Sequence, residues 1–236
     1  MKIAIVIPTY NEAENIEILV KKIAALSLND WRIFFVDDNS PDKTGEIIET
    51  LSAIFPITLI KRPQKLGLGS AYTAGFKQAL LSGAQYIFEM DADLSHDPND
   101  IPKLLQACQN GADLTIGSRK IKGGKIIGWN WQRHFMSNGA MFFSRLVLGL
   151  KTHDVTSGFR CYKKNVLESI NFDKISSGGY AFQEEMLCLV EKKGFNVKEI
   201  PVTFNDRKFG KSKLSHKDIW EFFLIIFRLK FDKNNK

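Results

Sequence analysis

Apolar runs alternate with helix-like spacing along the first half of the chain. Residues 3–7 form a continuous apolar run that ends at Pro8, as expected for a strand buried on both faces. Apolar residues then recur at three- and four-residue steps between residues 16 and 26, which predicts a helix. The alternation continues through predicted strands at 31–36, 57–60, 85–90 and 113–117 and predicted helices at 44–54, 69–81 and 98–109. This order predicts an α/β domain in which neighbouring strands of the sheet are parallel.

The pattern is less regular after residue 117. Residues 120–128 are rich in glycine and lysine, and we expect a mobile loop there. We predict helices at 136–150 and 181–193, a strand at 197–204 and a last helix at 215–231. No linker or repeat divides the chain, so we expect one domain over residues 1–214, followed by an amphipathic helix and basic tail over 215–236.

Composition and charge narrow the possible partners. The chain has 236 residues, of which 44% are hydrophobic and 25% charged, as is typical of a folded globular domain. Its formal net charge is +7, and +6 of this falls in the last 30 residues. Because the rest of the chain is nearly neutral, nucleic acid is not an expected partner, whereas a local anionic partner fits the basic end. Cys108, Cys161 and Cys188 form no CxxC or Cys/His cluster, so we expect neither a zinc site nor a disulfide framework.

Polar clusters follow three of the predicted strands, at residues 8–12, 37–40 and 91–93. Ligands of open α/β sheets bind beyond the carboxyl ends of the strands, so we expect these clusters to line one site. A dinucleotide-binding turn would place the glycines of G-x-G-x-x-G after the first strand, and no glycine is present there. The trace at Gly67 and Gly69 has Tyr72 in place of the third glycine and follows a different strand, which disfavours a dehydrogenase.

Asp91 and Asp93 stand two residues apart, just beyond an apolar strand. Two carboxylates at this spacing can reach one hard cation, and Mg²⁺ or Mn²⁺ bound in this way completes its shell with water and substrate phosphates. A capping and turn role before the helix near Pro98 is the alternative, because the D-x-D pattern is common. The residues alone leave both interpretations open.

Several motifs, taken in order, resemble the family 2 glycosyltransferases of the GT-A fold. The main ones are IPTYNE at 7–12, VDDNSPD at 36–42 and DADLSH at 91–96. Further stretches are similar to the polyprenol-phosphate (dolichol-phosphate) mannosyltransferase branch of that family: KLGLGSAY at 65–72, GSR at 117–119, RH at 133–134, DVTSGFR at 154–160, GYAFQ at 179–183, DR at 206–207 and GKSKL at 210–214. The resemblance runs from about residue 3 to residue 214. It implies a Rossmann-like, mostly parallel sheet flanked by helices.

The resemblance implies an inverting, metal-dependent transfer of mannose from GDP-mannose to a polyprenyl phosphate. Asp91 and Asp93 would hold Mg²⁺ or Mn²⁺ on the diphosphate. Some relatives carry a side-chain amide where this chain has Ser95, whose hydroxyl is a weaker metal ligand that water can replace. The residues that would line the nucleoside are Pro8, Tyr10, Glu12, Val36, Asp38 and Ala92.

Cations complete the implied site. Arg119 and Arg133 would bind phosphates, and Arg207 and Lys213 would approach the donor diphosphate or the acceptor phosphate. The planar fork of arginine suits phosphate oxygens, and a diphosphate leaving group needs its charge neutralised. The second pKa of a phosphate monoester is about 6, so an acceptor phosphate is largely ionised at neutral pH and needs no strong general base. We therefore assign no such role to the histidines His96, His134 and His153.

Two other functions stay open at the level of sequence. One is a related transferase that uses UDP-glucose, UDP-GlcNAc or another donor, or that acts on a hydroxyl acceptor with Glu184 or Glu185 as the base. The other is a non-catalytic, membrane-associated binding module. Asp91, Asp93 and Arg119 are all present, which disfavours a binding module that has lost catalytic activity.

The predicted last helix is the main reason to expect contact with a membrane. Residues 219–231 present a wide apolar arc flanked by Lys217, Arg228 and Lys230. As a helix they would rise about 20 Å, which is short of a bilayer span, so we expect a helix lying in the interface. Packing of the arc onto the domain, or onto a membrane-embedded partner subunit, is the alternative. We expect peripheral attachment to the cytoplasmic face of a membrane, with residues 136–150 as a second contact.

Overall fold

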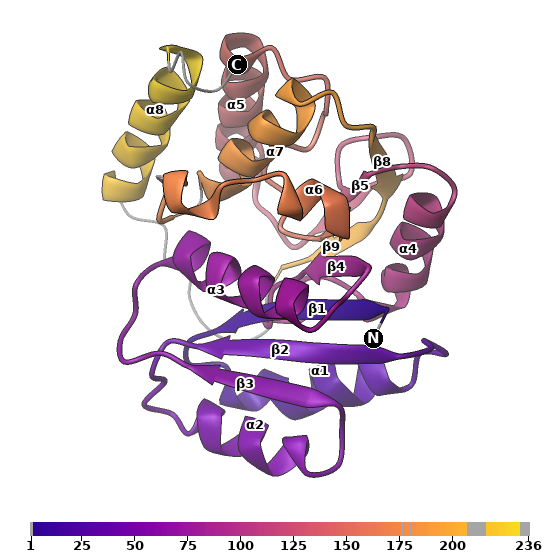
Figure 1. The fold of residues 1–236 in the computed structure, drawn as a ribbon. Coiled ribbons are helices and arrows are strands. Elements are labelled where there is room, and N and C mark those ends of the chain that lie inside the picture. The colour runs from indigo at the N-terminus through magenta and orange to yellow at the C-terminus, as the bar shows by residue number, and fades with distance from the viewer. Residues whose placement is uncertain (1, 176, 180, 207–215, 232–236) are drawn as a thin grey trace.

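A seven-stranded sheet with helices on both faces forms the centre of the molecule (Figure 1). The computed structural model describes residues 2–175, 177–179, 181–206 and 216–231, with 216–221 described by their backbone alone. Within these residues the strand order is β3-β2-β1-β4-β7-β5-β8. The strands are β1 (Ile3–Thr9), β2 (Trp31–Asp37), β3 (Ile57–Lys61), β4 (Tyr86–Glu89), β5 (Leu114–Ser118), β7 (Arg160–Lys163) and β8 (Val197–Pro201).

Most neighbouring strands are parallel, which confirms the predicted α/β sheet. Strands β3, β2, β1 and β4 are parallel, as are β5 and β8. Strand β7 is antiparallel to both β4 and β5 and separates them. This strand was not predicted, because it has only four residues and charged residues at both ends.

The helices lie close to their predicted positions, apart from a short helix at Lys164–Glu168 that was not predicted. They are α1 (Ala13–Ala24), α2 (Thr44–Ser52), α3 (Leu68–Leu81), α4 (Ile101–Gln109), α5 (Trp131–Leu148), α6 (Lys164–Glu168), α7 (Phe182–Lys192) and α8 (His216–Phe231), with short 3₁₀ turns at Pro98–Asp100 and Phe172–Lys174. Helix α5 begins five residues before the prediction, where the side chain of Asn130 accepts a hydrogen bond from Arg133 N and caps the helix.

Two predictions in the second half of the chain were wrong in part. The loop expected at 120–128 contains β6 (Lys125–Ile127), which pairs with β9 (Thr203–Asn205) in a separate two-stranded sheet. The single strand expected at 197–204 is therefore two strands. Its first half pairs with β5 in the main sheet and its second half with β6.

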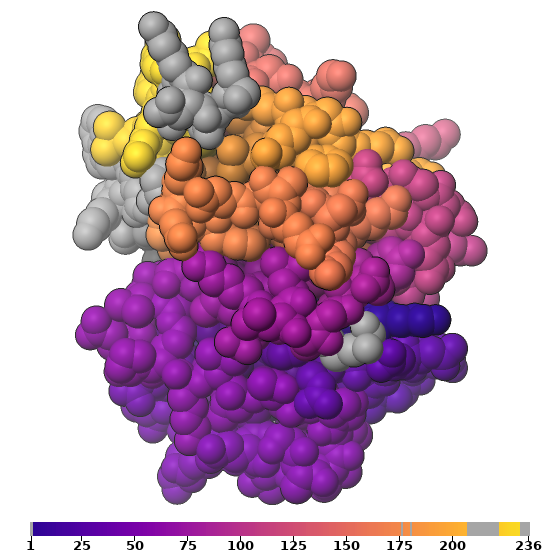
Figure 2. Space-filling model, in the orientation of Figure 1, coloured from indigo at the N-terminus to yellow at the C-terminus, as the bar shows by residue number. Residues whose placement is uncertain are grey.

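Two apolar layers enclose the main sheet. On β1, Ala4 and Val6 belong to the layer shared with α3 and α7, whereas Ile5 and Ile7 belong to the layer shared with α1, α2 and α4. Burial on both faces confirms the interpretation of the first apolar run. Figure 2 shows the segments of residues 1–90 at one end of the molecule, with the segments of residues 150–200 packed against them.

Helix α8 lies against α5 and α7. Its residues Ile225, Ile226 and Leu229 are buried, and Lys192 Nζ donates to the carbonyl of Leu229. Phe143 of α5 packs edge to face against aromatic rings of α8. Part of the apolar arc therefore covers the domain. Among the described residues, no helix combines the length and apolar character needed to cross a bilayer.

Candidate functional site

The three polar clusters meet at one edge of the sheet because β2, β1 and β4 are adjacent and parallel. Thr9 Oγ1 donates to Asp37 Oδ1 at 3.0 Å, and Asp38 N donates to the carbonyl of Thr9 at 3.1 Å. Asn11 N donates to Ser40 Oγ at 3.1 Å. The first two clusters are thus joined directly by hydrogen bonds.

Residues predicted to line a nucleoside surround this junction. Lys65 Nζ lies 4.5 Å from the centre of the Tyr10 ring, and Glu12 N donates to Thr44 Oγ1 at 3.0 Å. Asp38 forms an ion pair with Arg62 at 3.1 Å. Burial raises the pKa of Asp38, although the positive charge of Arg62 acts in the opposite direction.

Three other residues of the predicted nucleoside set differ in exposure. Pro8 is half-buried at the end of β1. Val36 is fully buried and Ala92 is 4% exposed, and both side chains belong to the apolar layers. Val36 and Ala92 therefore lie within the apolar layers and present little or no surface to a ligand.

Asp91 and Asp93 occupy the turn after β4. The hydroxyl of Tyr72 donates to Asp91 Oδ1 at 3.1 Å, and His96 Nε2 lies 3.6 Å from Asp91 Oδ2. Ser95 N donates to Asp93 Oδ1 at 3.0 Å. Ser95 Oγ is buried and has no hydrogen-bond partner within the part of the chain that the structure describes. Asp91 has a 39% exposed side chain, so its carboxylate is open to a ligand.

A buried charged network lies beneath Asp91. Arg160 Nε is 3.3 Å from Glu89 Oε1, and both side chains are fully buried. Arg160 also donates to the carbonyls of Val155, Ser157 and Gln183. Burial raises the pKa of Glu89 to about 7, although Arg160 opposes the shift. Arg160 therefore ties the end of β4 to the segment before β7 and to the start of α7.

Arg119 is fixed by a buried carboxylate. Its main-chain N and its Nε each donate to Asp154 Oδ2 at 2.8 Å, and Nη2 donates to Asp154 Oδ1 at 2.7 Å and to Thr156 Oγ1 at 2.7 Å. Asp154 is fully buried and Arg119 is 9% exposed. Burial acts to raise the pKa of Asp154, but the hydrogen bonds and charge of Arg119 bring it below its usual value.

Two aromatic residues connect the arginines with the turn that carries Asp91. The Phe204 ring lies 5.3 Å from both the His96 ring and the guanidinium of Arg119. The Trp129 ring lies 5.8 Å from Phe204 and 4.2 Å from the guanidinium of Arg133. Arg133 also forms an ion pair with Asp206 at 2.9 Å. The structure thus brings together Asp91, Arg119 and Arg133, which are far apart in the sequence.

Glu184 and Glu185 begin α7 and are nearly completely buried. Burial raises the pKa of Glu184 to about 8. Glu185 accepts hydrogen bonds from the main-chain N and the hydroxyl of Ser177. At neutral pH Glu184 is therefore mostly protonated and cannot act as a ready base, and Glu185 is held by Ser177.

Two predicted site residues lie outside the described part of the chain, and two residues that contact predicted site residues had no predicted role. Arg207 and Lys213 lie outside the described residues. No role was predicted for Asp154 or Tyr72, although both lie inside the motifs at 154–160 and 65–72. No group of three or more His, Cys, Asp and Glu side chains suited to a metal ion occurs in the described part of the chain.

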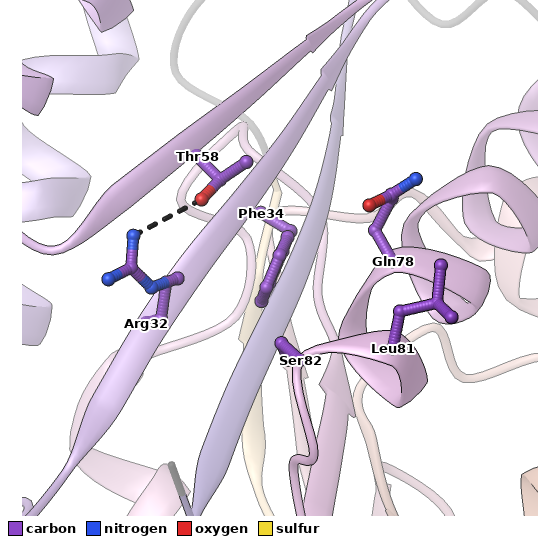
Figure 3. A pocket seen from close by; sticks show the side chains of 6 residues that line it. All are labelled: Arg32, Phe34, Thr58, Gln78, Leu81 and Ser82. Carbon is purple, nitrogen blue, oxygen red and sulfur yellow. Dashed lines mark hydrogen bonds between the residues drawn. The ribbon is translucent and has the colours of Figure 1, made fainter.

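An open hollow of about 490 Å³ lies at the opposite, amino-terminal end of the strands (Figure 3). In it, Arg32 Nη1 donates to Thr58 Oγ1 at 3.3 Å, and Gln78 and Leu81 face it from α3. Its lining includes no carboxylate, histidine or cysteine side chain. The candidate site described above lies at the other, carboxyl edge of the sheet.

Sequence comparisons agree on one family. The model of glycosyl transferase family 2 matches residues 4–170. Polyprenol monophosphomannose synthase of Mycolicibacterium smegmatis is 42% identical over 92% of this chain and 82% of that protein. Undecaprenyl-phosphate mannosyltransferase of Micrococcus luteus is 40% identical over 91% of this chain and 88% of that protein. Dolichol-phosphate mannosyltransferase of Pyrococcus furiosus is 42% identical over 97% of this chain, but the match covers only 64% of that longer protein.

The fold of this chain is similar to that of several solved structures. Glucosyl-3-phosphoglycerate synthase from Mycobacterium tuberculosis with UDP has a TM-score of 0.67 at 17% identity, over 97% of this chain and 78% of that chain. The same enzyme with Mn²⁺, UDP-glucose and phosphoglyceric acid also has a TM-score of 0.67. At this identity the likeness concerns the fold alone, and it confirms the predicted GT-A-like class.

Proposed function

This chain belongs to glycosyltransferase family 2, and from that premise we propose that it transfers mannose from GDP-mannose to a polyprenyl phosphate, with inversion at the anomeric carbon. The names of three relatives at 40–42% identity support the mannose and the lipid phosphate. The observation that carries the proposal is the continuous set of contacts that joins Asp91, at the end of β4, to the guanidinium groups of Arg119 and Arg133.

We infer that the donor nucleoside lies at the ends of β1 and β2. Tyr10, Glu12 and Asp38 supply an aromatic ring and two carboxylates there. The buried residues Val36 and Ala92 would shape the site from within the apolar layers. The diphosphate would then extend along the sheet edge toward β4. This direction follows the general location of ligands in open α/β sheets.

Asp91 and Asp93 would hold Mg²⁺ or Mn²⁺. Their setting fits such an ion, because one or two carboxylates suffice when water and substrate phosphates complete the shell. The exposed Asp91 carboxylate supports this fit, as does the Ser95 hydroxyl, which has no hydrogen-bond partner among the described residues. When bound, the ion would neutralise charge on the departing diphosphate.

Arg119 and Arg133 would bind phosphate beside that site. Asp154 orients the Arg119 guanidinium, and Trp129 supports the face of Arg133. An acceptor phosphate arrives ionised, so the transfer needs no base from the protein. The buried state of Glu184, whose pKa is raised to about 8, argues against the alternative in which a carboxylate activates a hydroxyl acceptor.

We further propose peripheral attachment to the cytoplasmic face of a membrane through α5 and α8. Large apolar side chains on both helices are exposed, including Phe142 at 67%, Leu146 at 69% and Leu224 at 67%. Figure 1 shows the two helices side by side at one end of the molecule. Apolar side chains on neighbouring helices can insert into the headgroup boundary of a bilayer. A membrane-anchoring partner subunit is the alternative occupant of this surface.

The test incubates purified protein with Mg²⁺ or Mn²⁺, a polyprenyl phosphate and a panel of nucleotide sugars, followed by mass analysis of the organic phase. We expect a mannosyl lipid phosphate from GDP-mannose. A product from UDP-glucose or UDP-GlcNAc instead would identify the alternative donor, and no lipid-linked sugar with any donor would refute the proposal.

Two variants test the metal assignment in the same assay. Asp91→Asn and Asp93→Asn should each lower kcat by about 100-fold or more, because each removes a charged ligand at the diphosphate. Near wild-type rates in both variants would show that the assignment is wrong.

A further inference from the structure

Tyr72 is the residue that interrupts the glycine-rich pattern of α3, and its hydroxyl reaches the aspartate pair. From the first turns of α3 it donates to Asp91 Oδ1 at 3.1 Å, across 19 residues of sequence. We propose that Tyr72 is a positioning residue that holds the Asp91 carboxylate in the orientation a divalent cation requires. This inference rests on the proposed metal-dependent function.

Two neighbouring aromatic rings hold the ring of Tyr72 in place. It stacks on Phe182 of α7 with centroids 5.8 Å apart and planes 5° apart, and on Phe76 with centroids 5.8 Å apart and planes 25° apart. Tyr72 is fully buried. The hydroxyl at the end of this ring is the group that meets Asp91. A fixed ring places that hydroxyl at one point relative to Asp91.

The two glycines before Tyr72 permit this packing. A Cβ on Gly69 would lie 2.5 Å from the carbonyl oxygen of Ser177 and 2.8 Å from Cδ2 of Phe182. A Cβ on Gly67 would lie 2.4 Å from the carbonyl oxygen of Gly178. Only glycine lets α3 approach the start of α7 this closely. The pattern therefore serves helix packing and the placement of Tyr72, and needs no dinucleotide to explain it.

The other oxygen of Asp91 faces a weaker contact. His96 Nε2 lies 3.6 Å from Asp91 Oδ2, and the His96 ring is held between Phe159 and Phe204. Of these two neighbours, Tyr72 alone is at hydrogen-bond distance. Residues that hydrogen-bond to metal ligands fix their orientation, and loss of such a partner typically costs about 10–100-fold in metal affinity.

The test compares Tyr72→Phe with Tyr162→Phe. Tyr162 is an equally buried tyrosine on β7 whose hydroxyl accepts from Arg160 Nη1 at 3.4 Å. Each substitution removes one buried hydroxyl and leaves the ring, so effects of general destabilisation appear in both. Mn²⁺ binding is measured by the electron paramagnetic resonance signal of free Mn²⁺, with saturating GDP, and GDP affinity is measured without metal.

We expect Tyr72→Phe to raise the Kd for Mn²⁺ about 10-fold or more, while Tyr162→Phe stays within about twofold of wild type. GDP affinity without metal should be equal in all three proteins. Wild-type Mn²⁺ affinity in Tyr72→Phe, or equal weakening in both variants, would overturn this inference and leave the proposed function standing. A wild-type protein that binds no Mn²⁺ with GDP would instead overturn the metal assignment itself, and this inference with it.

Discussion

The buried pair of Arg119 and Asp154 gives a prediction about stability whose size follows from its geometry. Arg119 donates three hydrogen bonds of 2.7–2.8 Å to a carboxylate that is fully buried. In Asp154→Asn the shape is kept, but the charge is lost and an amide group faces guanidinium donors. Removing one partner of a buried ion pair costs about 3–5 kcal/mol. Thr156 Oγ1 still accepts from Arg119, so we expect a loss of about 3 kcal/mol in the free energy of unfolding.

The pH dependence of this loss has a definite sign. The folded pKa of Asp154 lies below that of the unfolded chain, which is about 3.9. The ionised carboxylate therefore stabilises the fold above about pH 4, and this contribution disappears as the pH falls through the folded pKa. The difference between wild type and Asp154→Asn should be constant near neutral pH and shrink in acid.

Urea unfolding followed by circular dichroism, at pH 7 and at pH values below 4, measures both effects. Asp173→Asn is the control, because Asp173 forms an exposed ion pair with Lys77 at 2.8 Å and should lose less than about 1 kcal/mol. Equal losses in the two variants at pH 7 would refute the reasoning, as would a difference for Asp154→Asn that persists unchanged in acid.

Three further predictions concern activity, pH and lipid. Glu199→Gln should lower kcat/KM about 10-fold in a steady-state assay, because Glu199 accepts hydrogen bonds from the segments that carry Arg119 and Asp154. Glu191→Gln is the control and should keep the activity, because Glu191 accepts from Thr152, before Asp154 in the same loop. Because the pKa of Glu184 is raised to about 8, this residue alone should lower wild-type stability by at most about 1.4 kcal/mol per pH unit between roughly pH 5 and 8. Glu184→Gln should make the fall of stability with pH less steep by that amount in urea titrations. The double substitution Phe142→Ser and Leu146→Ser should lower the affinity for anionic vesicles, measured by co-sedimentation, about 10-fold or more without lowering stability. Unchanged vesicle binding would contradict the membrane proposal.

The sequence alone determined the elements that depend on local periodicity. A continuous apolar run predicted β1 as a strand buried on both faces, and apolar residues at helical spacing predicted α1. Because parallel strands end at one edge, the sequence also indicated where Asp38, Asp91 and Asp93 would gather. These features can be recognised within a window of about one element, which is the range over which hydrophobic patterns carry information.

Tertiary structure decided which distant residues meet. The partners of Asp91 and Arg119 are Tyr72, 19 residues away, and Asp154, 35 residues away. Strand β7 separates β4 from β5, and this order brings Arg160 beside Glu89 at the end of β4. No local pattern specifies such pairs, because they depend on strand order and on the close approach of α3 to α7. The sequence supplied the chemical groups of the site, and the packing of the sheet and helices fixed their orientation.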